Sequence, residues 1–88
     1  MVNEMKDATE RLLEIVLGTL CEHPEKAKIS VTINGSNSCL ISVAVCGTDY
    51  GKVIGQKGKI VKALRTLLQA FAGRYRIRFL FDVSEFSQ

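Results

Sequence analysis

The part of the chain whose residue types could do chemistry is a short turn with a glycine at each end, Gly55-Gln56-Lys57-Gly58. Glycine lacks a Cβ atom, so it adopts positive φ angles and lets another backbone approach closely. The turn also opens a predicted helix, whose first N–H groups and dipole favour a phosphate. The segment therefore predicts a clamp for the sugar-phosphate backbone of a nucleic acid.

The predicted binding site extends from this turn to its neighbours. Lysines supply mobile positive charge, and two isoleucines are candidates to line an apolar surface for the bases. The full set is Gly55, Gln56, Lys57, Gly58, Lys59, Lys52, Ile54, Ile60 and Lys62. Tyr50 and Tyr75 are further aromatic candidates for stacking on bases.

Other phosphate-binding and catalytic patterns do not fit these residues. A Walker loop ending at Gly58-Lys59 would need glycine at Val53 and Ser or Thr at Ile60. A dinucleotide-binding G-x-G-x-x-G is absent, and no nucleophile with an evident base or pair of catalytic carboxylates occurs, so we expect no enzymatic activity.

The cysteines do not predict a metal site, a disulfide or a cofactor. Three cysteines accompany one histidine, without a C-x-x-C pair, and we expect reduced thiols at Cys21, Cys39 and Cys46. The chain has no stretch of about 18 apolar residues, and its N-terminus is polar with mixed charge. We therefore expect a cytoplasmic protein without a signal peptide.

Charge is unevenly distributed, although the formal net charge is only +3. Residues 52–81 contain eight basic residues and no acidic residue. Such a stretch produces a local positive field, whose natural partner is a polyanion.

Hydrophobic periodicity predicts the elements that position the turn, in the order α-β-β-α-α-β. A capping box at Asp7 and Glu10 starts a helix that ends near Glu22. Its predicted inner stripe is Ala8, Leu12, Ile15, Val16 and Leu20. Two alternating segments around 29–33 and 39–45 predict a hairpin, joined by the turn cluster 34–38.

The second half begins with a short helix through Ile54, capped by Thr48 or Asp49. A long helix then runs from Lys59 to about Ala72, with Gly73 as its cap. Its predicted inner stripe is Ile60, Leu64, Leu67, Leu68 and Phe71. A last strand covers 75–83, parallel to the second strand, and residues 84–88 form a frayed tail.

This order of elements around Val53-Ile54-Gly55-Gln56-Lys57-Gly58 resembles a type II KH domain. The longer run from Gly51 to Leu68 looks like the small single-KH bacterial proteins of the KhpA/YlqC family. The resemblance implies an α+β fold with a three-stranded mixed sheet and three helices on one face, forming one domain over residues 1–88. It also implies single-stranded RNA as the ligand, clamped at the G-x-x-G turn. Position 56 is often lysine in that family, and Gln56 removes one positive charge.

The resemblance further implies a homodimer, or a heterodimer with a second KH-containing protein of the KhpB/Jag/EloR type. The family is linked to post-transcriptional regulation and, in some bacteria, to cell shape. In a KH fold, Ile41 and Val43 would form the opposite wall of the groove, and the 34–38 turn would close over the ligand.

The sequence leaves two alternatives open. The KH scaffold could serve protein interaction or dimerisation with incidental RNA contact, because Leu40 and Leu80 lie on outward strand faces. The same groove physics also permits single-stranded DNA binding.

Overall fold

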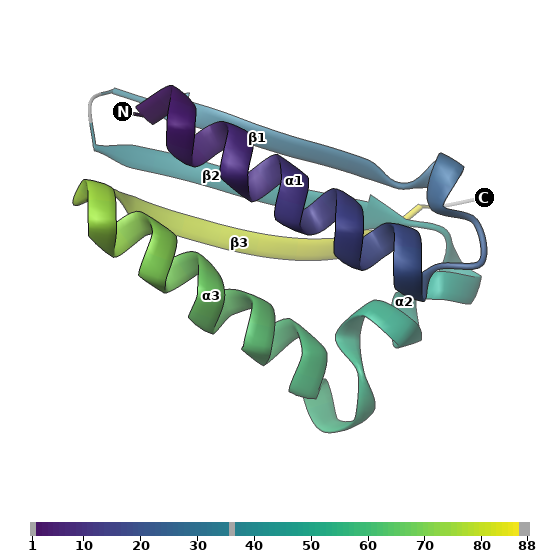
Figure 1. Ribbon diagram of the computed structural model, residues 1–88. Helices are drawn as coiled ribbons and strands as arrows, with labels where there is room; N and C mark the ends of the chain where they lie inside the picture. Colours follow the sequence, from purple (N-terminus) through teal and green to yellow (C-terminus); the bar gives the residue numbers. More distant parts are fainter. Residues whose placement is uncertain (1, 36, 87–88) are drawn as a thin grey trace.

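The computed structural model describes residues 2–35 and 37–86 as an α+β fold in the predicted order α-β-β-α-α-β. The helices are α1 (Val2–Leu20), α2 (Gly47–Ile54) and α3 (Lys59–Tyr75), and the strands are β1 (Lys28–Asn34), β2 (Ser38–Val45) and β3 (Arg78–Glu85). Two short 3-10 turns, η1 (Pro24–Lys26) and η2 (Gln56–Gly58), lie in the connections. Figure 1 shows the ribbon.

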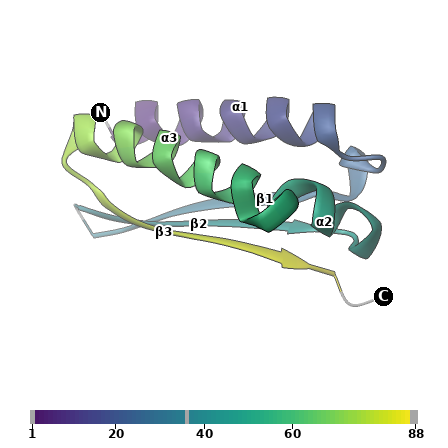
Figure 2. The ribbon, with the colours of Figure 1, turned by 90° about the horizontal axis from the view of Figure 1, so that it is seen from below.

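The three strands form one mixed sheet in the order β1-β2-β3. β1 pairs antiparallel with β2, placing Val31 opposite Ile41. β3 pairs parallel with β2, placing Phe81 beside Ile41. The crossover between the parallel strands carries α2 and α3, as a parallel connection requires. Figure 2 shows that the helices cover one face of the sheet and leave the other face open.

The core lies between the covered face of the sheet and the helices. Alternate residues of β2 point inward, and the side chains of Cys39, Ile41, Val43 and Val45 are buried. The facing helices contribute Leu13 and Leu17 from α1 and Leu64, Leu68 and Ala72 from α3. The three cysteines are free and buried.

Helix α1 differs from its prediction in both start and orientation. It begins at Val2, so Asp7 lies inside the helix and the proposed capping box is wrong. The inward stripe is Met5, Thr9, Leu13 and Leu17, whereas Ile15 is 68% exposed. Apolar residues at 12, 13, 15, 16 and 17 offer two adjacent stripes at helical spacing, and only packing against the sheet selects one of them.

The end of α3 also differs from its prediction. The helix continues through Gly73 to Tyr75, and Arg76 adopts the left-handed conformation after it, with φ 55°. The Arg76 N–H donates to the carbonyls of Ala72 and Gly73, which completes the cap without a glycine. Leu67, expected on the inner stripe, is 46% exposed.

Strand β3 is displaced toward the C-terminus relative to its prediction. It begins at Arg78 rather than near Tyr75, and Ser84 and Glu85 pair with Ala44 and Val45. The Phe86 N–H also donates to the Val45 carbonyl at 2.8 Å. The expected fraying is therefore wrong for 84–86, while 87 and 88 lie outside the described residues.

Candidate functional site

Helix α2 carries the chain into the predicted site, and its start is organised by Asp49. The residue before the helix is Cys46, and neither Thr48 nor Asp49 caps it, because Asp49 lies inside the helix with a fully buried side chain. Its carboxylate accepts hydrogen bonds from the backbone N–H groups of Glu22 and His23, at 2.8 and 3.0 Å. Asp49 thus ties the end of α1 to the beginning of α2.

The surroundings of Asp49 also determine its charge state. Burial raises the pKa of this carboxyl group, but the hydrogen bonds from Glu22 and His23 lower it, as do the Cys46 thiol and the charge of Lys52. The net result is a pKa below the ordinary value of 3.8. Asp49 is therefore a buried carboxylate that stays ionised because its neighbours donate hydrogen bonds to it.

The turn between α2 and α3 has the backbone that its glycines allow. Gly55 has φ 81° and ψ 167°, a region that only glycine occupies readily. Lys57 and Gly58 follow with left-handed φ values of 56° and 74°. Three positive φ angles in four residues produce a tight reversal that leads directly into α3.

Gly55 is also required for close packing inside the turn. A Cβ atom at this position would lie 2.7 Å from Ile60 Cγ1 and 2.8 Å from the Ile60 nitrogen. At Gly58 the nearest atom to a Cβ would be Lys62 Cε at 3.7 Å, an ordinary contact. Gly55 is therefore needed because a side chain there would collide with Ile60, whereas Gly58 is needed for its positive φ angle.

Two backbone N–H groups at the start of α3 already donate hydrogen bonds to carbonyls within the turn. The Gly58 N–H donates to the Gly55 carbonyl at 3.1 Å, and the Lys59 N–H donates to the Gln56 carbonyl. These two amides are not free for a ligand. The attraction for an anion at this end of α3 then comes from the helix dipole and from the lysine side chains.

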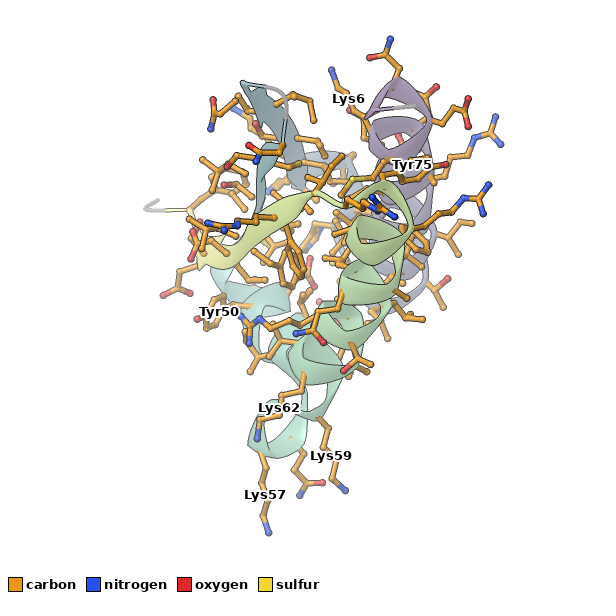
Figure 3. The ribbon with its side chains drawn as sticks, turned by 90° about the vertical axis from the view of Figure 1, so that its left-hand side faces the viewer. Lys6, Tyr50, Lys57, Lys59, Lys62 and Tyr75 are labelled. Atoms are coloured by element: carbon orange, nitrogen blue, oxygen red, sulfur yellow. The ribbon has the colours of Figure 1, made fainter. Side chains whose placement is uncertain are left out.

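Three of the predicted lysines gather at one tip of the molecule. Figure 3 shows Lys57 and Lys59 with their side chains directed away from the body of the protein, and Lys62 with its side chain beside the turn. All three are exposed, as is Gln56, and none forms an ion pair with another residue in the described part of the chain. The tip is an accessible cationic surface.

Lys52 occupies a different environment from the other lysines. Its ammonium group lies 3.1 Å from Glu22 Oε1 and 4.0 Å from Asp49 Oδ1. Two carboxylates therefore already compensate its charge. The sequence offered no signal for this pair, because Glu22 is 30 positions away at the end of α1.

The apolar members of the predicted site lie next to the turn. Ile54 and Ile60 are each half-buried, and Ile60 packs partly against the core. Ile41 and Val43, the expected opposite wall, are 0% and 1% exposed, so that expectation is wrong. They lie on the covered face of the central strand, where the helices bury them.

Strand β3, at the edge of the sheet, lies next to α3. Arg65 of α3 reaches it, with Nη2 donating to the Phe81 carbonyl at 3.4 Å and the guanidinium 5.9 Å from the Phe81 ring centroid. Arg65 is thus a further positive residue between the turn and the sheet edge, outside the predicted set.

The hairpin turn does not close over the site. Figure 1 shows the end of β1 and the start of β2, which flank the hairpin turn, beside the C-terminal end of α3, while the glycine turn precedes its N-terminal end. Seventeen residues of helix separate the two ends, about 25 Å at the helical rise. Tyr75 lies at that distant end and donates a hydrogen bond to Glu4 at 3.4 Å. Neither feature reaches the turn, and Ser36 lies outside the described residues.

Two structural features bear on other classes of function. None of the helices in the described part of the chain combines the length and apolar character needed to cross a membrane. Among residues 2–35 and 37–86, no group of three or more His, Cys, Asp or Glu side chains is arranged to hold a metal ion.

Comparisons with known proteins place the chain among bacterial relatives. The family described as KhpA/KhpB, KH domain, matches residues 10–83. The RNA-binding protein KhpA of Chlamydia pneumoniae is 30% identical over 76 residues, covering 86% of this chain and 96% of that protein. The proteins of the same name from Borreliella burgdorferi and Clostridium perfringens are 33% identical over 72 residues and 36% identical over 63 residues. These alignments cover 82% and 72% of this chain, and 87% and 83% of the relatives. No solved structure matches the chain significantly.

Proposed function

We propose that this chain, which belongs to the KhpA/KhpB family of KH domains, binds single-stranded RNA at the turn Gly55–Gly58. The observation that carries the proposal is the exposed tip where Lys57, Lys59 and Lys62 surround the turn. Its relatives are named RNA-binding proteins. We assign it no catalytic role and no cofactor, and we place it in the bacterial cytoplasm, where RNA is available.

The turn supports a division of roles among the site residues. The compact backbone at Gly55 and Gly58 lets a sugar-phosphate strand approach the positive end of α3. Lys57, Lys59 and Lys62 neutralise the phosphates, and the half-buried side chains of Ile54 and Ile60 support the first bases. Gln56 contributes a neutral hydrogen-bonding group.

Among the lysines of the proposed site, Lys52 is the least available for direct contact with a phosphate. Its ammonium group can reach RNA only by exchanging Glu22 for a phosphate, because that carboxylate lies 3.1 Å away. The ion pair is exposed on both sides, so this exchange costs little. Lys52 is therefore an auxiliary contact in the proposed site.

A single KH turn clamps about four nucleotides, which limits the affinity of one copy. We therefore propose self-association, or pairing with a second KH-containing protein of the KhpB/Jag/EloR type, as the way to gain affinity through effective concentration. A role in post-transcriptional regulation and in cell shape would follow from RNA binding in such an assembly.

The proposal predicts loss of RNA binding when Gln56 and Lys57 are both replaced by aspartate. The change of three charge units should weaken binding to a short unstructured RNA pool at least about tenfold, because the phosphate contact of Lys57 becomes repulsive and position 56 gains a negative charge. Fluorescence anisotropy measures the affinity, and circular dichroism checks the fold.

A matched control places the same charge change elsewhere. Figure 3 shows Lys6 at the opposite end of the molecule from Lys57. Lys6→Asp combined with Asn3→Asp also alters three charge units, and it should leave most of the affinity intact. Equal losses in both double variants would mean that overall charge, not the turn, governs binding.

Two further measurements test the proposed RNA site: the dependence of affinity on salt concentration and the competition by single-stranded DNA. Two or three phosphate contacts predict an affinity that falls roughly tenfold between about 50 and 200 mM salt, so a flat response would contradict phosphate clamping. Single-stranded DNA of the same sequence should compete less well than RNA. If DNA competes better, single-stranded DNA becomes the assigned ligand.

A further inference from the structure

The two edges of the sheet differ in how the rest of the chain covers them. Helix α3 runs along β3 at one edge, and Arg65 of α3 bonds the Phe81 carbonyl there (Figure 1). At the other edge β1 pairs only with β2, and no helix or strand of the described chain runs along its outer side (Figure 1). An uncovered strand presents N–H and C=O groups that can pair with the backbone of another chain.

The backbone of β1 presents a defined set of groups at this edge. The Phe86 N–H donates to the Val45 carbonyl at 2.8 Å, so odd-numbered residues of β2 turn their backbone polar groups toward β3. Even-numbered residues of β2 therefore face β1, where they pair with even-numbered residues. The N–H and C=O groups of the odd-numbered residues of β1 then point outward, and these residues are Ile29, Val31 and Ile33.

A cavity lies beside the start of this edge, between β1 and the C-terminal half of α1. Its volume is about 490 Å³, within the range of about 300–1,000 Å³ that is typical of ligand pockets. Apolar side chains and two carboxylates line it together: Leu17, Pro24, Ala27, Ile29, Glu14 and Glu25. The cavity can therefore accept a group that is partly apolar and partly cationic.

The charge of the cavity is negative. Glu14 and Glu25 are exposed, and no basic side chain of the described residues lines the cavity. Glu14 forms no ion pair within the described part of the chain, whereas His23 Nδ1 lies 3.7 Å from Glu25 Oε2. Glu10 lies one turn before Glu14 on the same side of α1. This surface repels RNA and attracts a cation.

Gly18 leaves one side of the cavity open. It lies inside α1, where glycine destabilises a helix relative to alanine. A Cβ atom at this position would meet nothing within 4 Å, and its φ is not positive. Neither packing nor backbone conformation in the single chain requires a glycine here. Because Gly18 lines the cavity, its missing side chain leaves room for one that a ligand supplies.

We propose that an extended segment of another protein adds to the outer edge of β1 and places an arginine side chain in this cavity. The apolar lining accepts the methylene groups of the arginine. The carboxylates of Glu14 and Glu25 accept hydrogen bonds from its guanidinium. The outward backbone groups of Ile29, Val31 and Ile33 pair with the main chain of the segment.

The geometry of α1 and β1 also fits a second basic residue in the segment. Alternate residues of a strand are about 6.6 Å apart, close to the rise of about 5.4 Å for one helical turn. A basic side chain two positions from the first therefore faces Glu10. Basic arms of this kind are typical of proteins that bind nucleic acid, so the edge would connect such a protein to this chain.

The first test uses a fluorescently labelled peptide of alternating threonine and arginine, seven residues long like β1. Anisotropy with the full chain should show saturable binding. Glu14→Gln combined with Glu25→Gln should weaken it about tenfold or more, because the guanidinium loses two charged acceptors. Asp82→Asn combined with Glu85→Gln removes the same charge from β3 and should leave binding unchanged.

A second pair of variants fills the cavity without removing any contact of the fold. Gly18→Leu places a side chain over the apolar lining and should abolish peptide binding. Gly73→Leu is the matched control, because Gly73 is also a helical glycine with nothing within 4 Å of a Cβ atom. Both variants should keep or raise the melting temperature, since leucine favours a helix more than glycine does. Loss of binding in Gly18→Leu is then not a loss of fold.

Methylation of alternate peptide amides tests the pairing with β1. Either the arginine amides or the threonine amides face β1, and the other set faces water. Methylation of one set should abolish binding, and methylation of the other set should preserve it. Equal effects of both sets, or binding of the polyamine spermine as tight as that of the peptide, would show that only charge is recognised and would overturn strand addition.

The outcome is separable from RNA binding. The double variant Gln56→Asp with Lys57→Asp should lose RNA and still bind the peptide, and Gly18→Leu should still bind RNA. If the unaltered chain does not bind the peptide, or if Gly18→Leu binds it at full strength, the β1 site is wrong, whereas the RNA assignment is unaffected.

Discussion

Gly55 and Gly58 have different physical roles in the turn that we assign to RNA. At Gly55 the backbone lies in a region reserved for glycine, and Ile60 occupies the space where a Cβ atom would stand. At Gly58 the left-handed φ is the main constraint, and a side chain would meet only ordinary contacts. The two glycines therefore differ in how far they tolerate replacement.

This difference predicts unequal losses of stability. Gly55→Ala should cost about 3 kcal/mol, from backbone strain and the collision with Ile60. Gly58→Ala should cost about 1 kcal/mol, and Gly58→Asn less, since asparagine tolerates left-handed angles. Urea unfolding measures all three. Equal costs at both glycines would show that Ile60 moves freely out of the way.

At the scale of elements, the orientation of α2 depends on a link to α1 that bypasses the sheet. Asp49 accepts N–H groups from the two residues that follow Cys21 at the end of α1, and it also receives the Cys46 thiol at 3.4 Å. α2 is only eight residues long, too short to be stable without such tertiary support. The buried carboxylate therefore helps to hold the helix that presents the turn.

Asp49→Asn should lower the melting temperature by several degrees at neutral pH, because an amide offers one oxygen where two accept hydrogen bonds. The pKa of Asp49 in the fold lies below its ordinary value of 3.8. Its stabilising effect is therefore complete well above pH 3.8 and is lost as the pH falls through the folded-state pKa.

Thermal melts across pH should show the gap between the variant and the unaltered chain narrowing below about pH 3.8. The exposed Asp7, replaced by Asn, is the matched control and should produce little change at any pH. A gap that stays constant into acid would contradict the charge-based role of Asp49.

The whole molecule separates its surfaces by function. The cationic tip lies at the start of α3, the hairpin connection lies near its other end, and the open sheet face lies away from both α1 and α3 (Figures 1 and 2).

Several features followed from the sequence because they depend on neighbouring residues. The alternation in 39–45 predicted which side of β2 is buried, and the inward side chains of Cys39, Ile41, Val43 and Val45 confirm it. The glycines at 55 and 58 predicted the reversal between two helices, since backbone sterics act within a few residues. The order of elements and the parallel pairing of β2 and β3 followed from the same local patterns.

Other features were decided only by the tertiary structure, because they depend on residues far apart in the chain. Packing against the sheet selected Leu13 and Leu17 over Ile15 as the inward side of α1. Asp49, predicted as a helix cap, is instead buried and accepts a hydrogen bond from the Glu22 N–H beyond the end of α1. The Glu22 carboxylate in turn forms an ion pair with Lys52. Local patterns encode which residues alternate or turn, whereas the choice of partner for each charge and each apolar side follows from which surfaces the fold brings together.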